Sequence, residues 1–152
     1  MKTAVFPGSF DPITKGHESI VRRALPLFDH IIIAIGTNQD KTGYFPLDKR
    51  LHWIGQVFGD CRQVSVESYT GLTVDFCRQK NALHIIRGLR TSADFEFERS
   101  VAQVNKRLEP SIETVFLLTQ PEFVMITSSI VREVHKYGGD ISQFIPAAVK
   151  ID

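Results

Sequence analysis

Short apolar runs, each long enough for one β-strand, alternate with segments of helical periodicity along this chain. The sequence predicts strands at residues 3–6, 30–35, 64–67, 84–87 and 114–118. It predicts helices at residues 17–28, 47–58, 73–80, 93–108 and 129–137, with one or two short turns from residue 141 onward. Alternation of this kind builds right-handed β-α-β units. The predicted fold class is therefore α/β, as one Rossmann-like domain with a parallel five-stranded sheet and helices on both faces.

Individual segments add detail to this prediction. Residues 30–35 form a continuous run dominated by isoleucine, which is typical of a strand buried on both faces of a parallel sheet. Pro26 lies inside the first helical pattern and is expected to end that helix early. The clearest helix, at 93–108, carries one apolar stripe, which consists of Phe97, Val101, Val104 and Leu108.

The composition limits the classes of protein to which this chain can belong. A chain of 152 residues with 43% apolar residues fits a single globular domain, expected to span residues 1–152. A net charge of +1 argues against a nucleic-acid or membrane partner. Pro7 interrupts the N-terminal region before a signal peptide could form, and the two cysteines show no disulfide or zinc spacing. We expect a cytoplasmic protein with free thiols.

Glycine, histidine and hydroxyl residues gather where the first predicted strand ends. In open parallel sheets, ligands bind beyond the carboxyl ends of the strands. Gly8 allows a phosphate to approach the backbone there, and Thr14 is a good N-cap that would place His17 in the first helical turn. The free N–H groups of such a turn bind anions. The alternative is a turn glycine, a capped helix and a surface histidine without a ligand.

The run Thr14-Lys15-Gly16-His17 resembles the T/H-x-G-H signature of a nucleotidyltransferase superfamily. The resemblance implies the nucleotidyltransferase fold.

Two arginines follow the fourth predicted strand. Arg87 and Arg90 flank Gly88 and Leu89, and guanidinium groups match phosphate oxygens in bidentate geometry. The alternative is a pair of solvated arginines, one of them paired with Asp94 or Glu98. The run at residues 87–90, followed by Ala93-Asp94-Phe95-Glu96-Phe97-Glu98, resembles the phosphopantetheine adenylyltransferase branch of the superfamily. The resemblance covers essentially the whole chain.

Hydroxyl residues also precede the last predicted helix. Ser128 and Ser129 can cap that helix and face an anion. We expect one serine to act as the N-cap. Residues 126–132 resemble the family element I-S-S-x-x-V-R/K, with Thr127 in place of a serine.

The resemblance implies that the adenylyl group of ATP is transferred to 4′-phosphopantetheine, giving dephospho-coenzyme A and pyrophosphate. The acceptor phosphate would attack the α-phosphorus in line, without a covalent enzyme intermediate. A phosphate monoester has a second pKa of about 6, so the attack needs no general base. Positioning and preorganised donors must provide the catalysis. A Mg²⁺ cofactor is expected on the substrate phosphates, with no protein metal site, although Asp11 could hold an outer-shell water.

The family match implies a role for each site residue. His17 is the expected transition-state stabiliser, and the residues expected to share the catalytic work are Ser9, Lys41 and Arg90. The residues expected to contact ATP are Ser9, Phe10, His17, Gly88, Leu89, Arg90, Glu98, Phe123, Val124, Met125, Ile126, Thr127, Ser128 and Ser129. Those expected to contact phosphopantetheine are Ser9, Lys41, Thr73 and Arg87. The protonation state of His17 stays open, because a helix N-terminus disfavours imidazolium whereas a bound triphosphate favours it.

The family also implies a homohexamer and feedback inhibition by coenzyme A. Two alternatives remain for the function. One is another transferase of the superfamily, of the nicotinamide mononucleotide adenylyltransferase or glycerol-phosphate cytidylyltransferase type. The other is a non-catalytic nucleotide-binding module, since a fold alone does not fix function.

Overall fold

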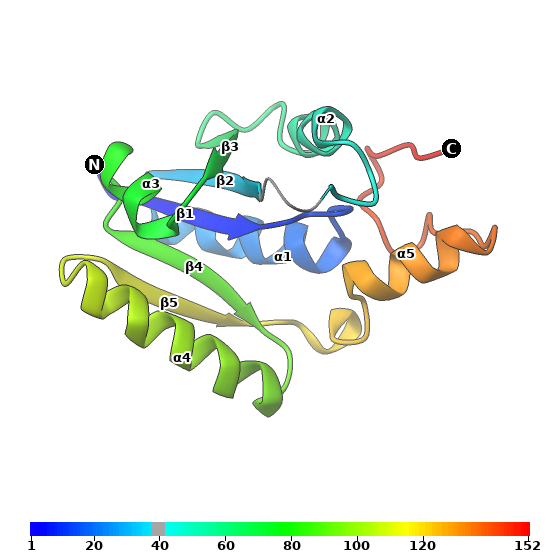
Figure 1. The fold of residues 1–152 in the computed structure, drawn as a ribbon. Helices are drawn as coiled ribbons and strands as arrows, with labels where there is room; N and C mark the ends of the chain where they lie inside the picture. The colour runs from blue at the N-terminus through cyan, green and yellow to red at the C-terminus, as the bar shows by residue number, and fades with distance from the viewer. Residues whose placement is uncertain (38–41) are drawn as a thin grey trace.

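A parallel sheet of five strands in the order β3-β2-β1-β4-β5 forms the centre of the molecule (Figure 1). The computed structural model describes residues 1–37 and 42–152. The strands are β1 (Thr3–Gly8), β2 (His30–Thr37), β3 (Val64–Thr70), β4 (His84–Leu89) and β5 (Glu113–Leu118). The predicted fold class is therefore confirmed.

Helices cover both faces of this sheet, as predicted. On one face lie α1 (Lys15–Ala24), α2 (Leu47–Val57) and α5 (Ser128–Lys136), all of which contribute to the larger core cluster. On the other face lie α3 (Thr73–Gln79), which closes the smaller core cluster, and α4 (Ser92–Leu108), which contacts β4, β5 and α3 (Figure 1). None of the helices in the described part of the chain is long and apolar enough to cross a membrane.

The strand β2 shows why the sheet needs two covered faces. Its side chains alternate between the two core clusters, with Ile31, Ile33 and Ile35 in the larger cluster and Ile32 and Ala34 in the smaller one. All five are buried. The continuous apolar run therefore reflects burial on both sides rather than an amphipathic strand.

Several boundaries differ from the prediction. The α-helical part of α1 ends at Ala24 and continues as a short 3-10 helix η1 (Leu25–Leu27), as expected from Pro26. The strands β1 and β4 extend to Gly8 and Leu89, so residues expected in loops belong to the sheet. The pairing of Gly8 with Ile35 and of Leu89 with Leu118 explains this extension.

The chain order of the sheet reverses between β1 and β4, and these two strands separate there. They pair at Ala4 with His84 and at Val5 with Ile85, whereas β1 pairs with β2 along its whole length. The carboxyl ends of β1 and β4 therefore lie apart. This is the topological switch point at which ligands bind in open parallel sheets.

The apolar stripe of α4 is not covered by the rest of the chain. The buried residue of this helix is Glu98, whereas Phe97 is 68% exposed and Val104 is 58% exposed. Val101 and Leu108 are exposed as well. The helical period was predicted correctly, but this face does not belong to the core of one chain.

Candidate active site

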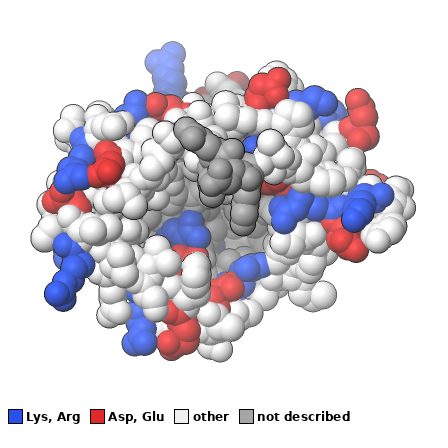
Figure 2. Space-filling model, in the orientation of Figure 1, with Lys and Arg blue, Asp and Glu red and all other residues white. Residues whose placement is uncertain are grey.

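Two adjacent cavities lie at the carboxyl ends of β1 and β4. The first, which we call the His17 cavity, has a volume of about 320 Å³. The second, the Thr73 cavity, has a volume of about 290 Å³. The two share four lining residues, which are Pro7, Gly8, Arg87 and Glu98. The molecular surface is hollowed at the centre of this face, and basic and acidic side chains lie together inside the hollow (Figure 2).

The His17 cavity brings together residues from all three predicted site segments. Of the residues expected to contact ATP, those that line it are Ser9, Phe10, His17, Gly88, Arg90, Glu98, Phe123, Ile126, Thr127, Ser128 and Ser129. Leu89, Val124 and Met125 do not line it, and Met125 is 82% exposed. Ser9 lines this cavity but not the Thr73 cavity, although contact with both substrates was expected.

The Thr73 cavity contains Thr73 and Arg87, as expected, together with residues that the sequence reasoning missed. Tyr69 donates or accepts a hydrogen bond of 2.8 Å with the Thr73 hydroxyl, and Asn105 lines the wall formed by α4. Asn105 follows Glu98 by seven residues, so helical periodicity could have placed both on one face. Lys41, expected to contact the acceptor, lies outside the described residues.

His17 is held by the residue that caps its helix. The Thr14 backbone N–H donates to Nδ1 of His17 over 3.0 Å, and the His17 backbone N–H donates to the Thr14 hydroxyl over 3.3 Å. The imidazole also packs against the ring of Phe10, with centroids 4.9 Å apart. Thr14 therefore caps α1 as predicted, and the cap fixes the orientation of the ring.

This arrangement favours the neutral form of the His17 ring in the protein without bound nucleotide. Burial, followed by the positive charges of Arg87 and Arg90, lowers the pKa of His17 from 6.5 to about 4. The ring is therefore neutral at pH 7. Because Nδ1 accepts a hydrogen bond from a backbone N–H, the single ring proton is on Nε2. The side chain can donate one hydrogen bond from Nε2.

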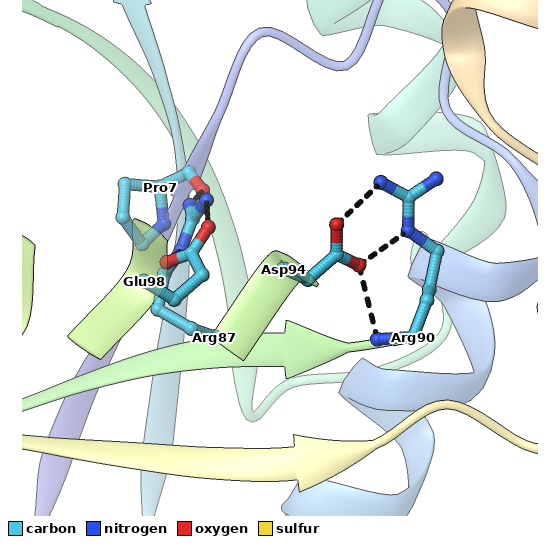
Figure 3. A network of polar contacts seen from close by, with 5 residues as sticks. All are labelled: Pro7, Arg87, Arg90, Asp94 and Glu98. Atoms are coloured by element: carbon cyan, nitrogen blue, oxygen red, sulfur yellow. Dashed lines mark hydrogen bonds and ion pairs between the residues drawn. The ribbon is translucent and has the colours of Figure 1, made fainter. Parts of the chain in front are cut away.

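Both predicted arginines are paired with acidic residues of α4 (Figure 3). Arg87 donates to both carboxylate oxygens of Glu98, at 2.7 and 2.6 Å, and to the Pro7 carbonyl at 2.6 Å. Arg90 donates to Asp94 through Nε at 3.0 Å. The alternative expected one such pair, whereas the structure has two, and both arginines also line the His17 cavity. The carboxylate of Glu98 orients Arg87.

The residues at the start of α5 differ from the prediction in which one caps the helix and in what the serine hydroxyls contact. Thr127, not a serine, is the N-cap, and its hydroxyl accepts from the Ile130 backbone N–H. The helix begins one residue earlier than predicted, which moves the cap position to Thr127. The Ser128 hydroxyl donates to the Pro12 carbonyl over 2.8 Å, and Ser129 accepts from Arg132. The α5 N-terminus is therefore tied to the segment after β1.

The segment after β1 is tightly packed. The ring of Phe10 is only 2% exposed and its backbone has a positive φ of 45°. A Cβ atom on Gly8 would lie 3.0 Å from this ring, so the glycine makes room for Phe10 as well as for a ligand.

Asp11 is not available as a metal ligand. Its two carboxylate oxygens accept from the backbone N–H groups of Tyr44 and Phe45, at 2.7 and 2.9 Å. The described residues contain no group of three histidine, cysteine, aspartate or glutamate side chains that could hold a metal ion. The cavity instead offers N–H, hydroxyl and guanidinium donors, which suit phosphate oxygens.

Comparison with known proteins shows similarity along most of the chain. The chain matches the model of the cytidylyltransferase-like family over residues 5–134. A phosphopantetheine adenylyltransferase from Cytophaga hutchinsonii is 51% identical over 145 residues, which cover 95% of this chain and 97% of that protein. One from Flavobacterium psychrophilum is 52% identical over 151 residues, covering 99% of each chain.

Solved structures share the fold at low sequence identity. A putative nicotinate-nucleotide adenylyltransferase from Vibrio parahaemolyticus superposes with a TM-score of 0.67 at 19% identity, covering 97% of this chain and 96% of that one. A bifunctional NMN adenylyltransferase/ADP ribose pyrophosphatase from Francisella tularensis gives a TM-score of 0.73 at 19% identity. This chain covers 95% of its own length but only 44% of the Francisella protein. These similarities concern the fold.

Proposed function

This chain belongs to the phosphopantetheine adenylyltransferase family, and we propose from this that its two adjacent cavities hold the two substrates of adenylyl transfer. The protein is a nucleotidyltransferase of coenzyme A biosynthesis. In the proposal, ATP occupies the His17 cavity and 4′-phosphopantetheine occupies the Thr73 cavity. The observation that carries it is the junction at Gly8 and Arg87, where two cavities of substrate size meet.

The His17 cavity suits a triphosphate. Gly8, Ser9 and Phe10 contribute backbone from the end of β1, and His17 and Arg90 add side-chain donors. The N-terminus of α5 lies on the same cavity through Ser128 and Ser129. N–H groups at helix N-termini and arginine side chains bind phosphate oxygens strongly.

The Thr73 cavity suits the acceptor. Arg87 stands at its junction with the His17 cavity, where the acceptor phosphate must lie to reach the α-phosphorus. Tyr69, Thr73 and Asn105 supply polar groups further along the cavity, and Phe97 and Val101 supply apolar surface. Such a mixture fits a long acceptor with amide and methylene groups.

The chemistry follows from positioning and from donors that are already in place. The acceptor phosphate is an anion near neutral pH and attacks the α-phosphorus directly. The neutral His17 donates a hydrogen bond from Nε2 to an α-phosphate oxygen as charge builds up on it. Because the ring is fixed by Thr14, this donor needs no reorganisation during the reaction.

Mg²⁺ would enter this site bound to the phosphates of ATP. The carboxylates among the described residues of the His17 cavity, Asp94 and Glu98, are both paired with arginines. The substrate phosphates would therefore hold Mg²⁺, and the ion would supply positive charge that neutralises the triphosphate.

The exposed stripe of α4 supports an assembly of several copies. Phe97, Val101, Val104 and Leu108 form an apolar face on this helix, and a contiguous apolar face of this kind marks an interaction surface. We propose that other copies of the chain cover it in a homohexamer. Because Phe97 and Val101 also line the Thr73 cavity, assembly would complete the wall of the acceptor site. Feedback inhibition by coenzyme A and a cytoplasmic location remain predictions.

A pyrophosphate-release assay tests the proposed function. Purified protein receives ATP, Mg²⁺ and one acceptor at a time, namely 4′-phosphopantetheine, nicotinamide mononucleotide or nicotinate mononucleotide. A further reaction contains CTP and glycerol phosphate. We expect pyrophosphate and dephospho-coenzyme A with 4′-phosphopantetheine alone. Release with another acceptor would assign the chain to a different transferase, and release with none would support a non-catalytic nucleotide-binding module.

A further inference from the structure

Arg50 lies behind the segment after β1 and is not part of either cavity lining. Its side chain is only 8% exposed, as is that of Asp11, with 4.0 Å between Nε of Arg50 and Oδ1 of Asp11. Nε of Arg50 donates to the Phe45 carbonyl at 2.9 Å, and Nη1 donates to the Ser9 carbonyl at 2.9 Å. A buried arginine with these contacts fixes two backbone segments at once.

The contact with Ser9 has a consequence inside the cavity. The peptide bond between Ser9 and Phe10 is trans, so the Ser9 carbonyl and the Phe10 N–H point in opposite directions. Arg50 holds the carbonyl on the side away from the cavity, which Arg50 does not line. The Phe10 N–H therefore lies on the side of this peptide opposite to Arg50, and Ser9 and Phe10 both line the His17 cavity.

The backbone at Phe10 needs such support. Its φ of 45° lies in the left-handed region, which a non-glycine residue adopts at a cost unless its surroundings hold it there. Asp11 anchors the next residue, because its carboxylate accepts from the Tyr44 and Phe45 backbone N–H groups. Phe45 thus bonds to Asp11 through its N–H and to Arg50 through its carbonyl, which closes the network.

Gly43 provides a second, independent sign that this network is closely fitted. A Cβ atom at Gly43 would lie 2.7 Å from Nη2 of Arg50 and 3.0 Å from Oδ2 of Asp11. Such distances force the neighbouring atoms to move. The chain therefore has a glycine where any side chain would displace the pair.

We infer that Arg50 is a positioning residue for adenylyl transfer: together with Asp11 it holds the Ser9–Phe10 peptide so that the Phe10 N–H is a preformed donor to the triphosphate. The inference rests on the proposed placement of ATP in the His17 cavity. It assigns to Arg50 an effect on ATP and not on the acceptor, because neither Ser9 nor Phe10 lines the Thr73 cavity.

The test compares Arg50→Met, Arg50→Lys and Gly43→Ala with the wild type. Displacing a reacting group by about 1 Å costs up to about 100-fold in rate, and we expect a loss of about that size in kcat/KM for ATP in Arg50→Met. Arg50→Lys keeps the charge but lacks the rigid pair of nitrogens that donate to the Phe45 and Ser9 carbonyls, so its loss should be smaller. KM for 4′-phosphopantetheine should stay near the wild-type value. Lys49→Met removes an exposed positive charge from the same helix and should change neither constant.

A merely structural role would reduce the folded fraction, which circular dichroism measures, and would lower kcat without changing KM for ATP. The KM for ATP therefore separates a positioning role from a structural one. If Arg50→Met does not fold, the constants of Arg50→Lys and Gly43→Ala decide whether Arg50 is a positioning residue. Wild-type kcat/KM for ATP in both, or a change confined to the acceptor KM, would overturn the inference.

The double variant Gly43→Ala/Arg50→Lys adds a direct check of coupling. If both changes act through the same pair, their losses should not add. Additive losses would overturn the inference. Calorimetric binding of ATP to each variant gives an answer that does not depend on the acceptor. Failure of the wild type to use 4′-phosphopantetheine would therefore count against the proposed function and not against the role of Arg50.

Discussion

The segment after β1 and the helix α4 line the same cavities, and the chain holds them in different ways. Between Pro7 and Pro12, four carbonyl oxygens accept hydrogen bonds, those of Pro7, Ser9, Asp11 and Pro12. Their donors come from Arg87, Arg50, Arg132 and Ser128. In contrast, α4 buries Glu98 and leaves its apolar stripe exposed.

This difference indicates a division of tasks between the two walls. The segment after β1 is fixed by groups from β4, α2 and α5, so a single chain can preorganise the donors for the nucleotide. The α4 wall is joined to the site through the pairs Arg87–Glu98 and Arg90–Asp94 (Figure 3). In the proposed assembly other copies cover its apolar face, so the acceptor wall would depend on assembly.

The largest effect is expected from removing the side chain of His17, the donor in α1 that Thr14 fixes. His17→Ala should lower kcat by about 100- to 1,000-fold, the usual cost of losing one preorganised donor to a developing oxyanion, with little change in KM for ATP. Steady-state pyrophosphate release measures both constants. His52→Ala, an exposed histidine of α2, is the control and should behave as the wild type. Near wild-type turnover in His17→Ala would contradict the role of His17 as a donor in the transition state.

The second prediction concerns the exposed face of α4. Val104→Asp should break the assembly into smaller species, because burying an unpaired carboxylate in an apolar interface costs several kcal/mol. Light scattering coupled to size-exclusion chromatography measures the mass. Leu27→Asp changes an exposed apolar residue of η1 and should leave the mass unchanged. Loss of mass in both variants, or in neither, would mean that this face of α4 is not the interface.

The third prediction uses the low pKa of His17. This pKa is about 4 in the folded protein and 6.5 in an ordinary histidine, so between these values the unfolded chain binds a proton that the folded chain does not. The free energy of unfolding should therefore decrease as the pH falls through this window. The contribution of His17 should be fully present above about pH 6.5. The contribution of this group between pH 7 and pH 5 is about 2 kcal/mol.

Urea unfolding at the two pH values measures this contribution. The His17→Asn variant lacks the titrating group and should lose less stability than the wild type over the same interval. An equal pH dependence in both proteins would mean that His17 is not held neutral by its surroundings.

The smallest effects are expected when the two ion pairs of α4 are weakened one at a time, and the loss of stability should differ between them. Glu98→Gln should destabilise the protein by about 1.5 kcal/mol, because it weakens two charged hydrogen bonds of a mostly buried carboxylate. Asp94→Asn should cost less than about 1 kcal/mol, since that pair is exposed. Denaturant titration of both variants gives the comparison. Equal losses would show that the two pairs hold the helix alike.

The sequence predicted the sheet and its order of elements from local patterns, whereas most residues of the His17 cavity were expected from the family resemblance. The isoleucine run of β2, the Thr14 cap and the early end of α1 at Pro26 each follow from a few neighbouring residues. Other features depend on contacts between distant segments. Arg50 reaches Ser9 across 41 positions, and no local pattern in α2 marks it as different from a surface arginine.

The stripe of α4 shows a second limit. Its apolar period is the same whether the helix packs on its own sheet or on another copy, so the pattern predicts a helix and not what covers it. The pairing of Arg87 with Glu98 was one of two interpretations of the same residues, and only the geometry shows that pairing and cavity lining occur together.

A crystal structure of the protein with Mg²⁺ and the non-hydrolysable analogue α,β-methylene-ATP tests the central claim most directly. We expect the α-phosphate at the junction of the two cavities, within hydrogen-bond distance of Nε2 of His17 and of the Phe10 N–H. A triphosphate bound away from this junction, or a His17 ring whose Nδ1 faces the phosphate, would contradict the account.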